Sequence, residues 1–363
     1  MSVSDEEFID LIQKNGVRKT SIIINRNIRN VNRRRRKLEE KYGPINRDAS
    51  VNATSTLYDA EGNTILQWVK RKAEREEQEK LLNEIALALS EKIPKVTPTP
   101  PPKHTEESLL NFYITTDYHL GMLSWREESG DDWDIKIAES LLLKWYGAAI
   151  KMAPDAKIGI LAQLGDMLHF DGMEAVTPEN KNILDADTRF QKVVRVAIRV
   201  LRQIIQMLLK KHEHLHIIMA DANHDPASSA WLREMMHVMY EDEPRITVDR
   251  SADTYYCYEF GNTSIFVHHG HKRKPSNIDD VFVAKFREVF GRTKYSYAHM
   301  GHMHHLDSRE TNLMIVTQHR TLAAKDAYAS RGGYMAGRSA DVITYSEKYG
   351  EVGRITITPE MVK

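Results

Sequence analysis

Apolar and polar positions follow two different patterns along this chain, and the change falls near residue 100. Before it, apolar residues recur at helical spacing within highly charged segments. After it, apolar runs of strand length alternate with helical patterns, the longest of them over residues 189–209. The six apolar runs are 112–116, 158–164, 215–219, 263–267, 295–298 and 313–317. This alternation predicts an α/β domain whose sheets are largely covered.

A basic segment covers residues 18–37, where nine residues are Lys or Arg and none is acidic. Apolar anchors at 22–24, 28 and 31, separated by Asn-rich turns, predict short helices that resemble a helix-turn-helix with its recognition helix over 30–39. Because unpaired cations repel one another, we expect phosphates of a nucleic acid to neutralise them, although a solvated basic helix would show the same pattern. The residues expected to contact nucleic acid are Arg29, Arg33, Arg34, Arg35, Arg36 and Lys37.

The remainder of the first hundred residues divides into three parts. Two strand-like segments flank Gly62 and Asn63 and predict a β-hairpin, which would be the wing of a winged helix. A charged helix with one apolar stripe follows, and then five of the twelve prolines fall between residues 94 and 102. The predicted organisation is a helix-turn-helix module over 1–69, a charged helix over 70–93, a Pro-rich linker over 94–108 and the α/β domain over 109–363.

Composition excludes several classes of protein. The 363 residues include 51 basic and 51 acidic ones, so the whole surface does not attract polyanions. The chain has no apolar run of about 18 residues and an acidic start, so we expect neither a membrane span nor export. A single cysteine, Cys257, excludes an internal disulfide and a cysteine-based metal site. We therefore expect a protein of the reducing cytoplasm with no membrane partner, whose 16 histidines suggest metal binding.

Metal-competent side chains follow five of the apolar runs in chain order. The motifs are Asp117-Tyr-His119, Gly165-Asp166 with His169, Asn223-His224-Asp225, His268-His269-Gly270-His271 and Gly301-His302-Met-His304. Open α/β sheets place their ligand sites at such strand ends. In an extended backbone, residues i and i+2 lie on one side, so a D-x-H or H-x-H pair can converge on one ion. Carboxylate, imidazole and amide ligands without thiolate suit Mn, Fe, Zn or Ni in a catalytic centre.

The order D-x-H, G-D, N-H-D, H-G-H, G-H-x-H resembles the calcineurin-like metallophosphoesterase superfamily over residues 110–320. One departure is Ala222, where the family usually has a glycine that supports the turn. The resemblance implies a two-sheet sandwich flanked by helices and two divalent ions, Mn²⁺ in the first place, with Fe, Zn, Ni or Mg as alternatives. It implies that one ion is held by Asp117, His119, Asp166 and His304. It implies that the other is held by Asp166, Asn223, His269 and His302, with Asp166 as the bridge.

The reaction that the resemblance implies is hydrolysis of a phosphate ester by a hydroxide that the two ions generate. His224 would stabilise the phosphoryl group or protonate the leaving oxygen, and Asp225 would orient the His224 imidazole. His169 and His271 are candidate substrate contacts. His268 is expected to be buried in its strand, whereas the histidines at 212, 214 and 216 are expected to be solvated.

Fold and metals do not select the substrate of such a domain. The basic module at the N-terminus favours a DNA phosphodiesterase, similar in kind to the SbcD-type repair exonucleases. The arrangement also resembles proteins of bacteriophages and prophages, in which case the cytoplasm would be that of the bacterial host. A small-molecule phosphomonoesterase, a cyclic-nucleotide phosphodiesterase and a non-enzymatic DNA-binding sensor stay as alternatives. The charged helix over 70–93 is compatible with a homodimer.

Overall fold

The computed structural model describes residues 3–42, 51–58, 64–71 and 98–362. The chain divides into two compact units, Met1–Ala88 and Leu89–Lys363, and each is described by itself. Most of the charged helix predicted over 70–93 and the first residues of the Pro-rich linker lie outside the described residues.

The N-terminal unit contains the two predicted helices, α1 (Asp5–Ile23) and α2 (Ile28–Tyr42). A capping box at Ser4 begins α1, and Gly16, with φ 71°, breaks it into two helical pieces. A small core joins the pieces to α2; its buried members are Phe8, Ile12, Ile24, Val31 and Leu38. The predicted anchor Ile22 is instead 75 % exposed. The two predicted helices are therefore present, whereas the helix-turn-helix assignment and contact with DNA stay predictions.

The predicted hairpin is present as the antiparallel pair β1 (Val51–Tyr58) and β2 (Thr64–Arg71), in which Leu57 lies opposite Leu66. The strand β2 includes residues 70 and 71, which the sequence pattern had assigned to the charged helix. Whether the hairpin acts as a wing stays a prediction.

The second unit is built on two sheets. The larger sheet has the order β13-β12-β3-β4-β5-β6, in which β3 to β6 are parallel and β12 is antiparallel to both of its neighbours. Its strands are β3 (Glu106–Thr115), β4 (Ala156–Gln163), β5 (His214–Met219), β6 (Ile246–Val248), β12 (Ala340–Ser346) and β13 (Gly350–Ile357). The smaller sheet has the order β10-β11-β9-β8-β7 with a parallel centre. Its strands are β7 (Tyr256–Phe260), β8 (Thr263–Val267), β9 (Tyr295–Met300), β10 (Asp307–Glu310) and β11 (Ile315–Gln318).

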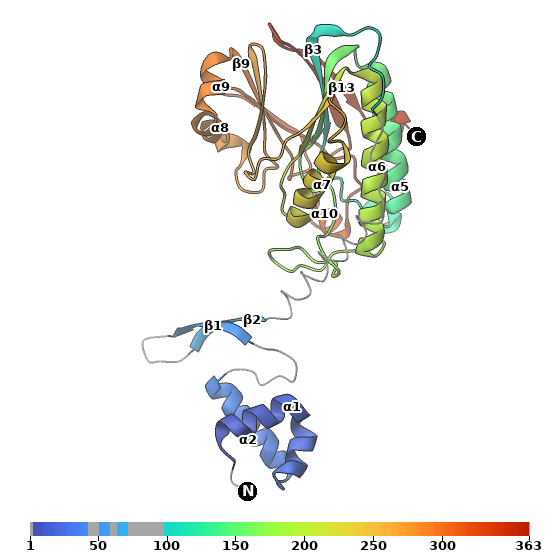
Figure 1. The fold of residues 1–363 in the computed structure, drawn as a ribbon. Helices are drawn as coiled ribbons and strands as arrows, with labels where there is room; N and C mark the ends of the chain where they lie inside the picture. Colours follow the sequence, from blue (N-terminus) through green and yellow to red (C-terminus); the bar gives the residue numbers. More distant parts are fainter. Residues whose placement is uncertain (1–2, 43–50, 59–63, 72–97, 363) are drawn as a thin grey trace. The chain divides into compact units, whose positions relative to one another are not determined.

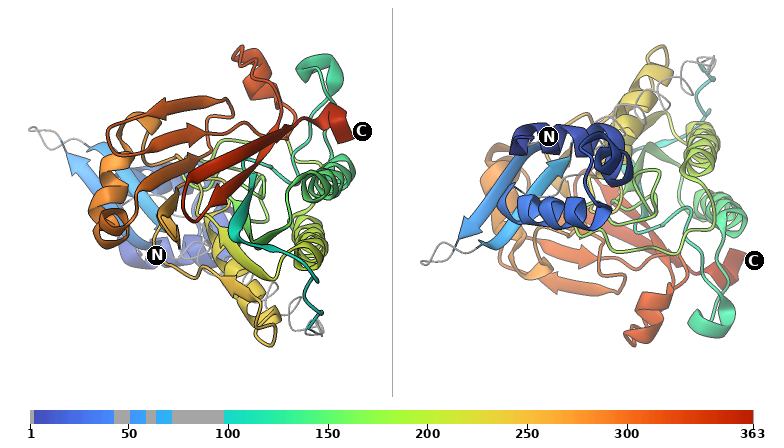
Figure 2. Two further views of the ribbon diagram at one scale, coloured as in Figure 1. Left: turned by 90° about the horizontal axis from the view of Figure 1, so that it is seen from above. Right: turned by 90° about the horizontal axis from the view of Figure 1, so that it is seen from below.

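Apolar side chains from both sheets form the core between them. Phe112 and Ile114 of β3 meet Ile265 and Val267 of β8, because alternate residues of each strand point into the sandwich. The outer face of the larger sheet is covered by α5 (Ile135–Met152) and α6 (Phe190–Lys211), and that of the smaller sheet by α8 (Asp279–Lys285) and α9 (Arg287–Arg292) (Figures 1 and 2). The predicted fold class, a two-sheet sandwich flanked by helices, is confirmed.

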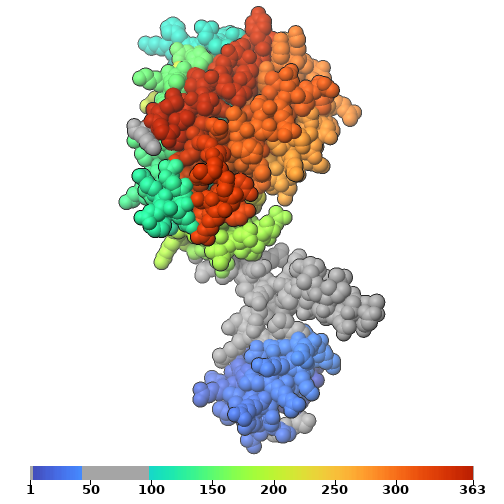
Figure 3. All heavy atoms as spheres, turned by 180° about the vertical axis from the view of Figure 1, so that it is seen from behind, coloured from blue at the N-terminus to red at the C-terminus, as the bar shows by residue number. Residues whose placement is uncertain are grey.

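The remaining elements are short, apart from the fourteen-residue α7. They are α4 (Arg126–Ser129), α7 (Pro226–Met239), η1 (Pro275–Asn277), α10 (Ala327–Arg331) and η2 (Pro359–Val362). Ser330 of α10 donates a hydrogen bond to the carbonyl oxygen of Glu128 in α4, which joins the loop after β3 to the loop after β11. Figure 3 shows the corresponding teal and red-orange segments side by side on one face. No helix of the described segments is both long and apolar enough to cross a membrane.

Candidate metal centre

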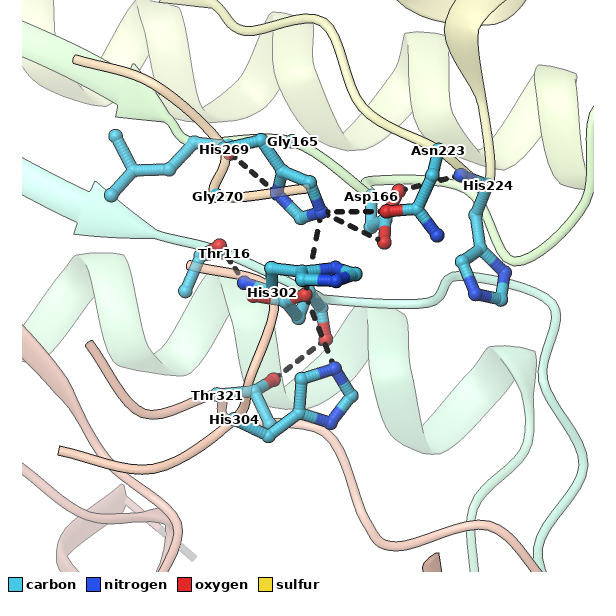
Figure 4. Close-up of polar contacts among 12 residues, drawn as sticks. Thr116, Gly165, Asp166, Asn223, His224, His269, Gly270, His302, His304 and Thr321 are labelled. Carbon is cyan, nitrogen blue, oxygen red and sulfur yellow. Dashed lines mark hydrogen bonds and ion pairs between the residues drawn. The ribbon is translucent and has the colours of Figure 1, made fainter. Parts of the chain in front are cut away.

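The predicted ligands converge at the carboxyl ends of β3, β4, β5, β8 and β9 (Figure 4). In one group, His and carboxylate atoms of Asp117, Asp166, His269 and His302 lie within 4.8 Å of one another. In a second group, Asp117, His119 and His304 do the same. All six acidic and histidine ligands named from the sequence therefore belong to two adjoining groups.

Asp117 belongs to both groups. Its Oδ1 atom lies 3.1 Å from Nε2 of His304 and 3.9 Å from Nε2 of His269. Its Oδ2 atom accepts hydrogen bonds from the Thr116 hydroxyl at 2.6 Å and from the His302 backbone N–H at 2.8 Å. One oxygen is thus fixed by the protein, and the other points toward the imidazoles of both groups.

Asn223 and Asp166 meet at His269. Nε2 of His269 lies 3.1 Å from Oδ2 of Asp166 and 3.1 Å from Oδ1 of Asn223, while its Nδ1 lies 2.9 Å from the carbonyl oxygen of Leu164. The carbonyl fixes the ring so that Nε2 faces the oxygens. All seven predicted ligands are therefore brought together. The assignment of the bridge to Asp166 stays a prediction, since the carboxylate shared by the two groups is that of Asp117.

The backbone of the ligands differs from the extended form that we assumed for the D-x-H and H-x-H pairs. Within the described segments, seven residues other than glycine have positive φ, and five of them are predicted ligands. These five are Asp117, His119, Asp166, His302 and His304. Left-handed backbone costs L-residues energy and occurs mainly at functional sites. The pairs therefore converge because both members turn back toward the centre.

Glycines allow the ligand loops to approach one another closely. A Cβ atom on Gly165, which has φ +108°, would lie 2.6 Å from Nδ1 of His269. A Cβ atom on Gly301 would lie 2.6 Å from Oδ2 of Asp117. The departure at Ala222 is harmless to the turn, since its φ is not positive and its methyl group is buried.

The carboxylates and the His269 and His304 imidazoles of the site shift one another's pKa values toward the charged forms. Burial alone would raise the pKa of Asp117, but the His304 and His269 imidazoles hold it below its ordinary value. Burial likewise opposes ionisation of Asp166, and His269 holds the pKa of that carboxyl well below its ordinary range. Burial lowers the pKa of His269, but Asp166 and Asp117 outweigh it and raise the pKa to about 9. The two carboxylates therefore attract positive charge at a buried position.

The residues present fit divalent metal ions. Oδ1 of Asp117 is a buried oxygen at the junction of the two groups, and it faces the imidazole Nε2 atoms of His304 and His269. A buried acceptor of this kind is costly unless a cation or a donor meets it. The donors are carboxylate, amide and imidazole, which suit Mn, Fe, Zn or Ni, and the free Cys257 is not among them.

The predicted role of Asp225 is wrong in its geometry. The carboxylate of Asp225 accepts hydrogen bonds from the Leu168 backbone N–H and from the Ser229 hydroxyl, so it ties two loops together. The His224 imidazole is oriented instead by the carbonyl oxygen of His169, 2.9 Å from its Nδ1. An acidic residue next to the histidine in sequence suggested a contact that the turn into α7 does not allow.

His169 lies beside the centre as a buried side chain. Its Nδ1 lies 3.4 Å from Nδ1 of His119, and its Nε2 has no partner in the described part of the chain. Burial, followed by the charge of His224, lowers the pKa of His169 to about 3. His271 has a buried Nδ1 without a partner in the same part of the chain, and its ring centroid lies 5.4 Å from that of His269. Both candidate contacts therefore adjoin the ligands, and substrate contact stays a prediction.

Two expectations about other histidines have different outcomes. His268 is fully buried, as expected, and stacks on Tyr255. His212 was expected to be solvated, and this is wrong, since its ring is fully buried between the Tyr113 hydroxyl and the carbonyl oxygen of Ala156. The three histidines alternate with other residues and were therefore interpreted alike. His212, however, precedes the strand β5 and packs against Gly159 of β4.

The predicted nucleic-acid contacts fall into two sets. Arg34 donates hydrogen bonds to Asp5 and to the carbonyl oxygen of Val3, and Arg35 pairs with Glu39, so these two cations are occupied within the unit. The other four are exposed on α2 and form no ion pair among the described residues: Arg29, Arg33, Arg36 and Lys37.

Two threonines that sequence reasoning missed support Asp117. Thr116 donates to its carboxylate, and Thr321 donates to its backbone carbonyl oxygen at 2.7 Å. Thr116 could have been suspected from its place before the ligand. Thr321 carries no sequence signal, since it lies 204 residues away.

Comparisons with known proteins give remote likenesses only. No protein-family model matches the chain, and no curated protein matches it. Among solved structures, Yfce, a phosphoesterase from E. coli, is similar at 14 % identity over 68 % of this chain and 98 % of its own, with a TM-score of 0.33. A novel archaeal phosphodiesterase is similar at 13 % identity over 68 % and 99 %, with a TM-score of 0.35. Vps29 from Entamoeba histolytica, complexed with Zn²⁺, is similar at 10 % identity over 69 % and 99 %, with a TM-score of 0.29.

The fold and the site of this chain, taken together, have the arrangement that the sequence motifs predicted. Two sheets form a sandwich between helices; residues of four motifs form two adjoining groups at the strand ends, and Asn223 of the remaining motif contacts His269. The second unit is thus an α/β sandwich with a candidate metal centre at the carboxyl ends of its strands.

Proposed function

We propose that the chain hydrolyses phosphodiester bonds of DNA with the help of two divalent ions, of which Mn²⁺ is the first candidate. The observation that carries the hydrolytic part is the convergence of the predicted ligands around the buried carboxylates of Asp117 and Asp166. The DNA part is supported by the four exposed cations of α2.

The ions would be held by the predicted ligands, Asp117, His119, Asp166, Asn223, His269, His302 and His304. When bound, they would lower the pKa of a water molecule and neutralise charge on the phosphate. The chain's own contribution beyond the ligands is His224. Because its Nδ1 faces the carbonyl oxygen of His169, its Nε2 is available to a phosphoryl or leaving-group oxygen. The His224 backbone N–H donates a 2.8 Å hydrogen bond to Oδ1 of Asp166. This contact fixes the backbone of the proposed acid–base residue relative to the predicted ligand.

Hydrolysis of three substrates by the full chain tests the proposal. The metal-depleted protein is supplied with Mn²⁺ and assayed on bis-p-nitrophenyl phosphate, p-nitrophenyl phosphate and linear DNA. We expect cleavage of the diester and of DNA, and a loss of about 100-fold or more in kcat for Asp166→Asn and for His224→Ala. His214→Ala, at an exposed position of β5, is the matched control and should keep full activity.

Two outcomes would contradict the proposal. Full activity of Asp166→Asn or His224→Ala would show that the assigned site is not the catalytic one. Cleavage of the monoester alone would exclude a DNA phosphodiesterase and favour a small-molecule phosphomonoesterase. That second candidate is supported by one observation: the second unit contains all seven ligands by itself.

A further inference from the structure

We propose that residues 271–274, which we call the basic loop, bind the backbone phosphates of a nucleic-acid strand beside the metal centre. This inference rests on the proposed function and adds a substrate-binding surface to it. The basic loop has the sequence His-Lys-Arg-Lys and directly follows the ligand His269 and Gly270.

The basic loop concentrates unpaired positive charge. Lys272, Arg273 and Lys274 are exposed, and none forms an ion pair in the part of the chain that the structure describes. Burial raises the pKa of the half-buried Asp221, and the charges of Arg233 and then Lys272 oppose this rise, so Asp221 lies near the start of the basic loop. Three adjacent like charges repel one another, so an anion with several negative groups would be favoured there.

Backbone contacts fix both ends of the basic loop. The His269 carbonyl oxygen accepts a 2.7 Å hydrogen bond from the Gly301 N–H, which ties the start of the loop to the next ligand motif. The Lys274 carbonyl oxygen accepts a 3.1 Å hydrogen bond from the Asn277 N–H in η1. Gly270, with φ +119°, lies so close to the Gly301 segment that a Cβ atom would be 3.0 Å from its carbonyl oxygen. The cations are therefore held next to the metal centre.

The chain length limits how far these cations lie from the ligand. Lys272 and Lys274 follow His269 by three and five residues, which span at most about 11 and 18 Å. Since one strand of B-form DNA rises about 3.4 Å per nucleotide, the basic loop can reach phosphates up to about five nucleotides from the bond being cleaved. A small phosphoester bound at the metals has no further phosphate for it.

The full chain tests this proposal in a background of Arg33→Ala and Arg36→Ala, which weakens DNA binding by α2. Lys272, Arg273 and Lys274 are replaced together by Ala. The control replaces Lys144, Lys151 and Lys210, exposed on α5 and α6, by Ala. Lys151 lies near the end of α5, which leads into β4, and Lys210 lies near the end of α6, which leads into β5. Both are therefore near the amino ends of these strands, whereas the ligands lie at the carboxyl ends. Fluorescence anisotropy with labelled single-stranded and duplex oligonucleotides gives the Kd, and hydrolysis of bis-p-nitrophenyl phosphate gives kcat/KM.

We expect the basic-loop variant to raise the Kd for at least one oligonucleotide about tenfold or more at 0.1 M salt. The slope of log Kd against the logarithm of the salt concentration should fall by about two to three. Its kcat/KM on the chromogenic diester should stay within about twofold of its background, and the control should change neither quantity. Unchanged Kd values for both oligonucleotides would overturn the proposal. An equal loss in oligonucleotide binding and in diester hydrolysis would also overturn it, because the cations would then act on the centre itself. Failure of the unsubstituted chain to cleave the diester would contradict the proposed function, whereas the Kd comparison would still test the basic loop.

Discussion

Buried contacts of single residues explain features that no motif contains. Gly159 of β4 lies against the His212 ring, and a Cβ atom there would be 2.5 Å from a ring carbon. The ring cannot move away easily, because its two nitrogens are held by the Tyr113 hydroxyl and the Ala156 carbonyl oxygen. The strand β4 therefore requires glycine at position 159, because a larger residue would collide with the His212 ring.

Gly159→Ala should accordingly destabilise the second unit by about 1–3 kcal/mol, the usual effect of overpacking. Gly147→Ala is the matched control, because nothing lies within 4 Å of a Cβ atom there and its position is inside α5. In that helix alanine should stabilise by about 0.5–1 kcal/mol. Urea-induced unfolding measures both. Equal free energies of unfolding for the two variants would contradict the close packing of Gly159 on His212.

His212 also predicts a pH dependence of stability. Burial lowers its pKa to about 4, against 6.5 in the unfolded chain. The folded state therefore holds the neutral ring, and its contribution to stability is complete above pH 6.5 and is lost as the pH falls toward 4. At pH 5 the loss should be about 2 kcal/mol. Unfolding at pH 7.5 and 5.0 should show a smaller pH effect for His212→Asn than for His214→Asn, which replaces an exposed histidine. The same pH effect in both variants would contradict this assignment.

At the scale of elements, the helix α2 has arginines of two kinds, those that form contacts within the N-terminal unit and those that are exposed. Arg34 lies 4.6 Å from the Phe8 ring centroid and binds Asp5, so it joins α2 to the start of α1. Its neighbour Arg33 is exposed and forms no ion pair among the described residues. The four consecutive arginines are therefore not equivalent, although they cannot be told apart in sequence.

Arg34→Ala should lower the stability of the N-terminal unit by about 1 kcal/mol, through the loss of a cation–π contact and an ion pair. Arg33→Ala should leave stability unchanged and weaken DNA binding, with a salt slope smaller by about 1. Thermal melting followed by circular dichroism and fluorescence anisotropy with duplex DNA measure the two effects. An unaltered salt slope for Arg33→Ala would exclude a phosphate contact at this residue.

The sequence predicted those elements whose apolar residues form a continuous run or recur at helical spacing. The six apolar runs became β3, β4, β5, β8, β9 and β11, and residues 189–209 became most of α6. The strands β12 and β13 were not predicted. Every residue of β12 is buried, its polar side chains included, so the usual alternation is absent, and only three of the eight residues of β13 have apolar side chains. The ligands could be predicted because each follows a strand, whereas the support from Thr321 depends on a contact across 204 residues.

At the scale of the whole molecule, the ligand set and the exposed cations of α2 belong to different compact units. A tethered nucleic-acid-binding unit raises the effective concentration of substrate at a catalytic unit without altering its chemistry. The proposed function therefore predicts that the two units contribute separately to activity, one through KM for DNA and the other through kcat.

Removal of residues 1–88 tests this separation. The remaining chain retains every predicted ligand, and Thr99 still contacts the buried Glu243 through its backbone N–H. We expect kcat/KM on bis-p-nitrophenyl phosphate to stay within about twofold, and KM for linear DNA to rise about tenfold or more, since the linked binding site is lost. A full-length chain carrying Arg29→Ala, Arg33→Ala and Arg36→Ala should reproduce the rise in KM. If DNA hydrolysis is unaffected by both changes, the N-terminal unit takes no part in binding the DNA substrate.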